Sequence, residues 1–178
     1  LEAINDLADW GANAVRCNIG GGSICSTRIV TGHGLPGLQT IFDCAKTDRD
    51  VAIIADGGIK TSGDVVKALA AGADFVMCGS LLAGTSESPG HIVNLPGQGY
   101  PVKEYRGMAS KDAQLDWRNK SSTPEGVASY VPYKGSIKDI LKDLEGGIRS
   151  GLSYTGARNL KELRHKAEWA RQTPAGTQ

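Results

Sequence analysis

One order of elements repeats three times along the chain: a stretch with helical spacing of apolar residues, a short apolar run, and a loop that carries glycine. The runs contain no alternating polar residues, a pattern typical of parallel strands covered on both faces. The repeat therefore predicts a parallel β/α architecture, with Thr61 or Ser62 capping the third helix. The helix-like stretches are residues 1–10, 38–46 and 64–71, and the apolar runs are residues 14–19, 51–55 and 75–78.

The length of the chain limits how much of such a fold it can form. A complete (β/α)8 barrel takes about 250 residues, whereas this chain has 178. Only one helix and one strand precede the loop at residues 20–28, so roughly five strands of a barrel are absent. We therefore expect residues 1–178 to be a single α/β domain, the C-terminal part of a (β/α)8 TIM barrel. Its open sheet edges predict that it is not an independent monomeric enzyme.

After Ala83 the chain departs from the repeat. Two strand-like stretches flank Pro-Gly-Gln-Gly at residues 96–99, which predicts a β-hairpin. Residues 110–124 are polar and lack a helical period, and we interpret them as a mobile flap of the kind that often closes over substrates. Hairpin and flap together form an insertion at residues 89–134. The two strand-like stretches are 91–95 and 100–105, later helices are expected at 137–148 and 160–169, and a disordered tail is expected at 171–178.

The loop at residues 20–28 reads GGGSICSTR and follows the first apolar run. Its glycines allow backbone conformations that bring N–H groups close to a ligand, and together with Ser23 these groups can hold an anion. Cys25 places a nucleophilic thiol in the same loop, which indicates covalent chemistry on a phosphorylated substrate. The alternative is that Cys25 is a small buried cysteine with only a packing role.

Glycines also follow the other two apolar runs, and the C-terminal ends of parallel strands share the active face of a barrel. Asp56 ends the second run, where a fixed carboxylate can accept hydrogen bonds from both hydroxyls of a ribose. Its alternative role is the N-cap of the next helix. This pattern predicts nucleotide binding without defining the reaction, and flavin-dependent barrels use similar loops. The expected phosphate site consists of Ser23, Gly57, Gly58, Gly79 and Ser80.

The composition gives no support to several other classes of function. A formal net charge of +1 does not indicate nucleic-acid binding, and no apolar stretch reaches the roughly 20 residues that span a bilayer. The N-terminal residues lack the basic and apolar regions of a signal peptide, so we expect a cytoplasmic location and no membrane partner. The four cysteines contain no CxxC pair, which favours reduced thiols over a zinc site.

Five motifs in a fixed order resemble those of the IMP dehydrogenase and GMP reductase family. They are GGGSICSTR at 20–28, ADGGI at 55–59, GADFVMCGSLLAG at 72–84, YRGMAS at 105–110 and EGVASYVPYKG at 125–135. GGIRSGLSYTGARNLKEL at residues 146–163 is also similar to the C-terminal helical segment of that family. The resemblance covers nearly the entire chain and implies a purine-nucleotide oxidoreductase.

The resemblance implies a role for each matching residue. Cys25 would be the nucleophile that attacks C2 of the purine, Asp56 would bind the ribose, and Thr27 and Glu125 would relay a proton. A solvated loop carboxylate remains the alternative for Glu125. The remaining assignments are Ser23, Gly58, Gly79, Ser80 and Tyr105 for the phosphate, Met108, Ala109, Ser110, Glu125 and Gly126 for the base, and the carbonyls of Gly20, Gly22 and Cys25 for a potassium ion.

The flap distinguishes the two branches of the family that the chain resembles. Dehydrogenases carry a long flap with an Arg-Tyr pair that activates water, whereas only 14 residues separate Ser110 from Glu125 and Arg118 has no adjacent tyrosine. The short flap resembles that of GMP reductase, which implies that Cys25 displaces ammonia from GMP and that NADPH reduces the resulting thioimidate to give IMP. One departure is Ser-Thr-Pro at residues 122–124, where reductases usually have an arginine.

Several alternatives stay open at this stage. IMP dehydrogenase, which would convert IMP to XMP with NAD, is the second enzymatic interpretation. An inactive nucleotide-binding or assembly fragment is the non-enzymatic one, since the barrel strands that meet the nicotinamide in this family are absent. The resemblance further implies a homotetramer, and the sequence does not distinguish NADPH from NADH.

Overall fold

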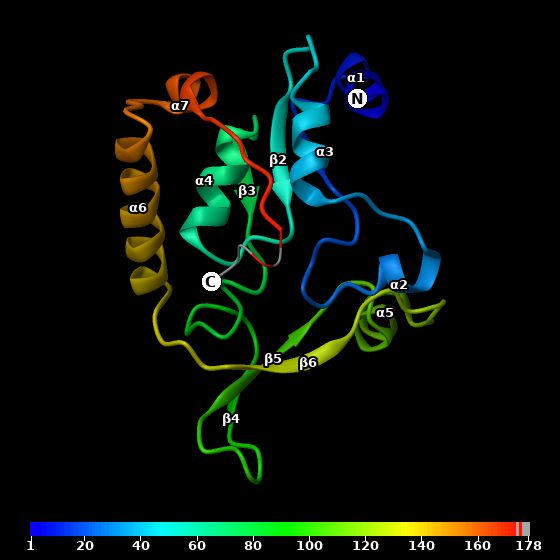
Figure 1. The fold of residues 1–178 in the computed structure, drawn as a ribbon. Helices are drawn as coiled ribbons and strands as arrows, with labels where there is room; N and C mark the ends of the chain where they lie inside the picture. The colour runs from blue at the N-terminus through cyan, green and yellow to red at the C-terminus, as the bar shows by residue number, and fades with distance from the viewer. Residues whose placement is uncertain (174, 176–178) are drawn as a thin grey trace.

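The computed structural model describes residues 1–173 and residue 175. A parallel sheet has the strand order β1-β2-β3, formed by Ala14–Cys17, Ala52–Asp56 and Phe75–Met77. Cys17 pairs with Ala55 and Asp56 pairs with Met77, so the three strands end at the same edge of the sheet (Figure 1). The predicted parallel β/α repeat is confirmed, and it brings three glycine-bearing loops to one end of the sheet.

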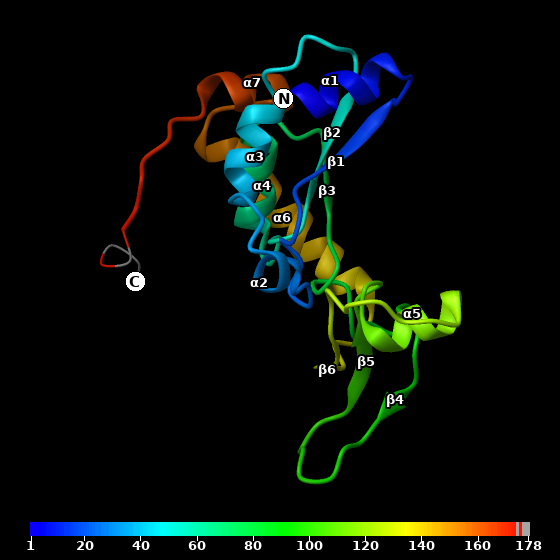
Figure 2. The same ribbon diagram turned by 90° about the vertical axis from the view of Figure 1, so that its right-hand side faces the viewer.

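Helices pack on one side of this sheet (Figure 2). They are α1 Glu2–Asp9, α3 Gly37–Cys44 and α4 Ser62–Ala70. The short α2 Thr27–Thr31, which was not expected, has no buried residue and lies at the end of the sheet where the strands finish (Figure 2). The predicted cap of α4 is confirmed: Thr61 Oγ1 accepts a hydrogen bond from Asp64 N at 3.2 Å, and the Asp64 carboxylate accepts one from Thr61 N at 3.0 Å. The apolar core lies between the sheet and these helices and includes Ile41, Ile53, Val65 and Ala73.

The expectation that both faces of the sheet are covered is wrong for β3. Phe75 is 60% exposed and Met77 is 37% exposed. Both side chains point to the face that α3 and α4 do not cover, because residues two apart in a strand share a face. Apolar runs without polar alternation therefore predicted the strand correctly but not the covering of its second face.

Two further helices complete the layer on the covered side. They are α6 Ile137–Tyr154 and α7 Leu160–Lys166. α6 packs closely on α4, because a Cβ atom added at Gly151 would lie only 2.7 Å from Val66 Cγ2. Arg164 of α7 donates to the carbonyl oxygen of Ala73 at 2.7 Å and pairs with Asp74 at 2.8 Å, which fixes α7 to the turn before β3.

A second, antiparallel sheet extends away from the first (Figures 1 and 2). Its strand order is β4-β5-β6, formed by Ile92–Val93, Val102–Arg106 and Ala128–Pro132. The predicted hairpin of β4 and β5 is confirmed, whereas β6 was not expected. Lys103 is buried at the base of this sheet and donates to the carbonyl oxygens of Thr85 (2.9 Å) and Ser88 (2.6 Å), which ties the sheet to the loop after β3.

The interpretation of residues 110–124 as a segment without helical structure is wrong, because Lys111–Arg118 form helix α5. Ser110 caps this helix by accepting a hydrogen bond from Ala113 N at 3.3 Å, and Asn119 ends it in the left-handed conformation. The buried residues of α5 are Ala113 and Gln114, one small and one polar, so no hydrophobic period marked the helix.

The C-terminal end follows α7. The last helix ends at Lys166 rather than at the expected residue 169, and Trp169 packs edge to face on Phe42 with ring centroids 4.8 Å apart. The tail predicted at residues 171–178 falls partly outside the described residues, which exclude 174 and 176–178. Within the described part of the chain, no helix is long and apolar enough to cross a bilayer.

Candidate active site

The loops after β1 and β2 meet at the C-terminal edge of the parallel sheet. A Cβ atom added at Gly57 would lie 2.6 Å from the carbonyl carbon of Gly21, and Gly57 has a φ of +84°. Asn18, also at positive φ (104°), donates from Nδ2 to the carbonyl oxygen of Asp56 at 2.9 Å. Glycine at position 57 and asparagine at position 18 thus allow the two loops to approach closely.

Asp56 does not cap a helix, so its alternative role is wrong: Thr61 is the N-cap of α4. The Asp56 Oδ2 atom instead pairs with the Arg16 guanidinium, at 3.1 Å from Nε and 3.0 Å from the terminal nitrogen. Within the described residues no group donates to Asp56 Oδ1. The arginine therefore orients a carboxylate that keeps one oxygen for a further hydrogen bond.

Cys25 lies beside a segment that is 100 residues away in the sequence. Its thiol donates to Thr27 Oγ1 at 3.2 Å, and its Sγ atom is 3.6 Å from the carbonyl oxygen of Glu125. Two backbone hydrogen bonds join the segments: Ser26 N to Glu125 O at 2.9 Å and Val127 N to Ile24 O at 3.0 Å. The three residues proposed for catalysis, Cys25, Thr27 and Glu125, are thus brought together.

The chain offers a direct comparison for the packing role considered for Cys25. Cys17 is buried in the core, where burial and then the neighbouring Cys44 raise the pKa of its thiol to about 12. Cys25 is half-buried and outside the core cluster, and its thiol is held by a hydroxyl. Cys17 therefore has the environment of an inert packing thiol, and Cys25 does not.

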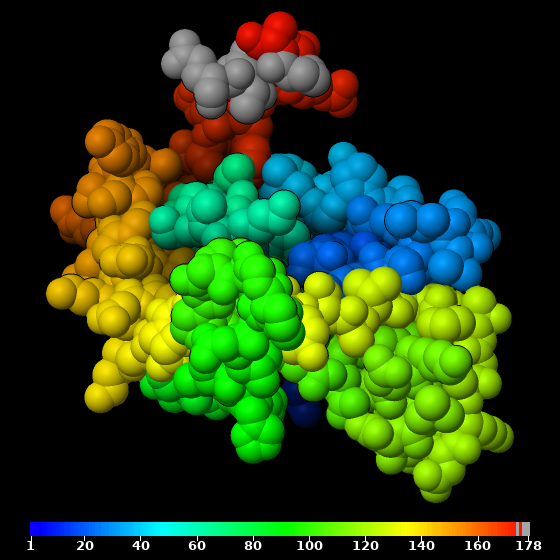
Figure 3. Space-filling model, turned by 90° about the horizontal axis from the view of Figure 1, so that it is seen from below, coloured from blue at the N-terminus to red at the C-terminus, as the bar shows by residue number. Residues whose placement is uncertain are grey.

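The residues expected to line the base lie next to Glu125. The Glu125 N–H donates to the carbonyl oxygen of Ala109 at 3.1 Å, and a Cβ atom added at the buried Gly126 would lie 3.2 Å from Ser110 N. Met108 is 72% exposed. The Ser110 hydroxyl is buried and caps α5, so its contact with a base would come from the backbone. Seen from the ends of the strands, the segment that contains Glu125 lies between the cysteine loop and α5 (Figure 3).

The residues expected at the phosphate fall on the loops after the three parallel strands and, for Tyr105, on strand β5. Tyr105 on β5 reaches Gly79, where an added Cβ atom would lie 2.7 Å from the tyrosine oxygen. The carbonyl oxygen of Ser80 accepts a hydrogen bond at 2.6 Å from Lys134, whose pKa is lowered by burial. Ser23 and Gly58 are exposed at their loop tips.

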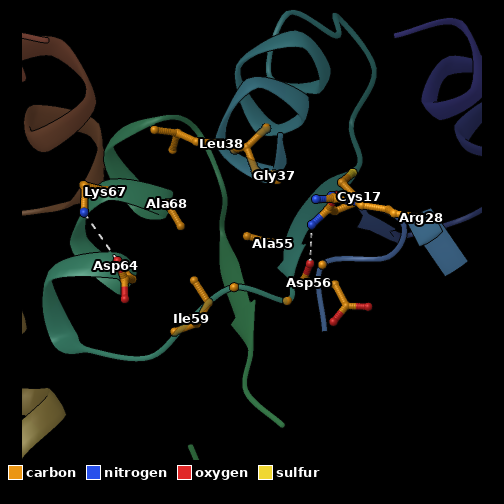
Figure 4. Close-up of a pocket in the computed structure, with 15 residues that line it drawn as sticks. Cys17, Arg28, Gly37, Leu38, Ala55, Asp56, Ile59, Asp64, Lys67 and Ala68 are labelled. Carbon is orange, nitrogen blue, oxygen red and sulfur yellow. Dashed lines mark hydrogen bonds and ion pairs between the residues drawn. The ribbon is translucent and has the colours of Figure 1, made fainter. Parts of the chain in front are cut away.

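Two cavities lie at this end of the sheet. The larger, of about 610 Å³, is lined by Gly79, Tyr105 and Met108 together with Trp117 of α5, and this volume is in the range of small-molecule sites. The smaller, of about 270 Å³, lies between α3 and α4, with Asp56 and Ile59 among the residues that line it (Figure 4). Each cavity is lined by three residues expected to bind a nucleotide: Gly79, Tyr105 and Met108 in the larger, and Asp56, Gly57 and Gly58 in the smaller. Only the larger cavity has the volume of a small-molecule site, so it is the better candidate.

The loop of Gly20, Gly22 and Cys25 offers backbone oxygens for a cation. No described residue donates a hydrogen bond to the carbonyls of Gly20 and Cys25, whereas the carbonyl of Gly22 accepts from Cys25 N at 3.1 Å. Carbonyl oxygens of this kind suit a hard cation such as potassium. Among the described residues, no group of three or more His, Cys, Asp or Glu side chains is arranged to bind a metal.

The sequence analysis missed residues that hold the loops in place. Arg28 donates to the side-chain oxygen of Asn18 at 3.0 Å and to the carbonyls of Ile19 (3.1 Å) and Leu35 (2.6 Å). Asn18 lies two residues before the glycine run, and the tolerance of asparagine for positive φ in loops is a signal that could have identified it. Nothing in the sequence indicates the acceptors of Arg28.

Comparisons with known proteins give one family. The model of the IMP dehydrogenase / GMP reductase domain matches residues 1–178. Inosine-5′-monophosphate dehydrogenase of Nitrosopumilus maritimus is 46% identical over 189 residues, covering 98% of this chain and 39% of the relative. The enzyme of the same name from Aquifex aeolicus is 48% identical over 186 residues, covering 98% of this chain and 38% of the relative.

A solved structure also matches: a cysteine-to-alanine variant of GMP reductase from Trypanosoma brucei in complex with guanosine 5′-monophosphate. It has a TM-score of 0.92 and 43% sequence identity, and the match covers 98% of this chain and 37% of that one. The chain thus spans less than two fifths of the length of the relatives described here. The family match over the full chain and the shared fold show that this chain belongs to the IMP dehydrogenase / GMP reductase family.

Proposed function

We propose that this chain carries the catalytic part of a GMP reductase, which converts GMP to IMP and ammonia with NADPH through a covalent bond to Cys25. One observation supports this proposal most: the Cys25 thiol is held by Thr27 and lies against Glu125, beside the loops expected to bind phosphate and ribose. A nucleophile with these neighbours suits attack on an electron-poor purine carbon.

The proposed reaction has two steps. Cys25 Sγ forms a bond to C2 of the guanine base and loses its proton, the C2–N2 bond breaks, and the amino nitrogen takes up one proton and leaves as ammonia. When bound, NADPH would supply the hydride that C2 takes up, and breaking of the C–S bond would then release IMP and the Cys25 thiolate. The covalent step divides one difficult substitution into two easier ones.

The chain's own residues would supply the protons. Thr27 already accepts the hydrogen of the Cys25 thiol at 3.2 Å and is placed to pass it on. The backbone carbonyl of Glu125 lies 3.6 Å from Cys25 Sγ, and its side chain is proposed to relay a proton to the departing amine. Proton transfer by a positioned side chain typically contributes about 10²–10⁴-fold in rate.

The substrate would be held between the loops that follow the parallel strands and the segments next to α5. Ser23, Gly58, Gly79, Ser80 and Tyr105 are proposed to bind the phosphate, with Gly57 allowing the close approach of the loops. Asp56 Oδ1 would accept from the ribose, since its Oδ2 is already held by Arg16. Met108, Ala109, Ser110 and Gly126 are proposed to line the base. The carbonyls of Gly20, Gly22 and Cys25 are proposed to bind potassium.

The flap supports the reductase over the dehydrogenase. Arg118, the only arginine between Ser110 and Glu125, stacks on Trp117 with its guanidinium carbon 4.1 Å from the ring centroid, and no tyrosine accompanies it. The dehydrogenase alignments extend over 186 to 189 residues, more than the 178 of this chain, so those relatives carry additional residues. The name of those relatives makes IMP dehydrogenase the second candidate.

A single assay tests the proposal. The purified chain is mixed with GMP and NADPH in potassium buffer, and NADPH is followed by its near-ultraviolet absorbance, with Cys25→Ser as the control. GMP-dependent loss of NADPH in the wild type alone supports the reductase, whereas reduction of NAD with IMP supports the dehydrogenase. GMP binding without turnover supports the nucleotide-binding fragment.

The location and oligomeric state of the protein are also part of the proposal. We propose that the protein acts in the cytoplasm as a homo-oligomer, a tetramer in the pattern of the family, with the exposed face of β3 covered in the assembly or by further chain. Light scattering that shows a stable, cooperatively folding monomer would contradict this part.

A further inference from the structure

Gln114 is a buried amide inside the flap helix. Only 4% of its surface is exposed. Its Nε2 atom donates to the carbonyl oxygen of Ala109 at 3.0 Å, just before α5. Its Oε1 atom accepts hydrogen bonds from Ser122 N at 2.8 Å and Ser122 Oγ at 3.0 Å, just after α5. One side chain therefore joins the two ends of the flap.

Hydrogen bonds continue from this amide to the cysteine loop. The Ala109 carbonyl that accepts from Gln114 also accepts from Glu125 N at 3.1 Å. The Glu125 carbonyl accepts from Ser26 N at 2.9 Å and lies 3.6 Å from Cys25 Sγ. Gln114 is thus connected to the nucleophile through two backbone carbonyls without touching it.

The chemistry of these contacts requires an amide. Ala109 presents an acceptor and Ser122 presents two donors, so the side chain between them must both donate and accept. A glutamate would retain the bonds to Ser122 but would turn a carboxylate oxygen toward the Ala109 carbonyl. A methionine would leave buried donors and acceptors without partners, which is unfavourable.

We infer that Gln114 is a positioning residue that holds the base-binding turn at Ala109 and the Glu125 segment in register with Cys25. This inference rests on the proposed function, because it assigns the base to that turn. The phosphate and ribose residues Ser23, Asp56 and Ser80 lie outside the flap. Loss of Gln114 therefore acts on recognition of the base and leaves recognition of the sugar phosphate unchanged.

The test compares two ligands on the full chain by calorimetry: GMP, and ribose 5-phosphate, which lacks the base. The variants are Gln114→Met, Gln114→Glu and the matched control Gln39→Met, at an exposed glutamine of α3. We expect the Kd of GMP to rise about tenfold or more in Gln114→Met and by less in Gln114→Glu. The Kd of ribose 5-phosphate should stay within about twofold, and Gln39→Met should resemble the wild type.

Every other outcome contradicts either the positioning role of Gln114 or the proposed function. Equal weakening of both ligands would show that Gln114 has only a general structural role, and unchanged GMP binding would remove the role altogether. If the wild type binds neither ligand, the proposed function fails, and amide hydrogen exchange then decides the inference. Exchange at Ser122 and Glu125 that is at least tenfold faster in Gln114→Met than in Gln39→Met supports the positioning, and equal exchange overturns it.

Discussion

Replacing Gly57 with alanine tests the contact between the loops after β1 and β2. The new Cβ atom would lie 2.6 Å from the Gly21 carbonyl carbon and 2.9 Å from Gly22 N, both backbone atoms that cannot rotate away. Gly58 is the matched control: its φ of +78° resembles the +84° of Gly57, but a Cβ atom there meets nothing within 4 Å. The difference between the two variants therefore isolates the clash from the backbone strain.

The expected magnitudes follow from these two terms. Placing alanine in the left-handed region costs about 1–2 kcal/mol, which is the whole effect for Gly58→Ala. Gly57→Ala adds overpacking of about 1–3 kcal/mol. For a chain of this length 1 kcal/mol corresponds to roughly 2–4 °C in Tm, so Gly57→Ala should melt about 2–12 °C below Gly58→Ala.

The assay is thermal unfolding followed by circular dichroism at one protein concentration. Gly63→Ala provides a third reference, because Gly63 lies inside α4 at an ordinary helical φ with its nearest neighbour at 3.6 Å. That variant should gain about 0.5–1 kcal/mol from helix propensity. If Gly57→Ala melts at the same temperature as Gly58→Ala, the loops do not meet as described.

Three further predictions follow. Gly151→Ala should destabilise the chain by about 1–3 kcal/mol, because its Cβ atom would lie 2.7 Å from Val66 Cγ2. Gly146→Ala, whose Cβ atom would meet nothing within 4 Å, should be stabilising. If urea unfolding ranks the two variants in the opposite order, α4 and α6 do not pack as described. Ser110→Ala should cost about 1 kcal/mol through loss of the α5 cap, measured in the same way, with Ser121→Ala near neutral. Burial raises the pKa of Asp64, but hydrogen bonds from Lys60, Thr61 and Lys67 outweigh burial and lower the pKa below its ordinary value. The stabilisation that Asp64 contributes is therefore present above about pH 4 and is lost as the pH falls below it. Asp64→Asn should make the free energy of unfolding depend less on pH in this range.

The sequence predicted the elements whose signal is local. Apolar runs and helical spacing located the parallel strands, and Thr61 was among the two capping candidates because its side chain bonds within its own turn. Helix α5 was missed because its buried face is Ala113 and Gln114, which produce no hydrophobic period. Strand β6 was missed because most of its residues are exposed.

In the site, too, only the features with a local sequence signal could be predicted. The glycine-rich loops and Cys25 were visible as local motifs, but their meeting with Glu125 across 100 residues was expected only from the family resemblance. The sequence did not identify three residues that support the site, namely Arg16, Arg28 and Gln114. Their partners are backbone carbonyls and side chains fixed by the fold, and no spacing in the sequence encodes such contacts.

The central claim is that Cys25 forms a bond to the purine and releases ammonia at the expense of NADPH. The most direct measurement counts ammonia and NADPH in the same reaction of the chain with GMP, for the wild type and for Cys25→Ser. The account predicts one ammonia released for each NADPH oxidised in the wild type and neither change in the variant. Equal NADPH oxidation in Cys25→Ser, or no GMP-dependent change in a wild-type chain that binds GMP, would contradict it.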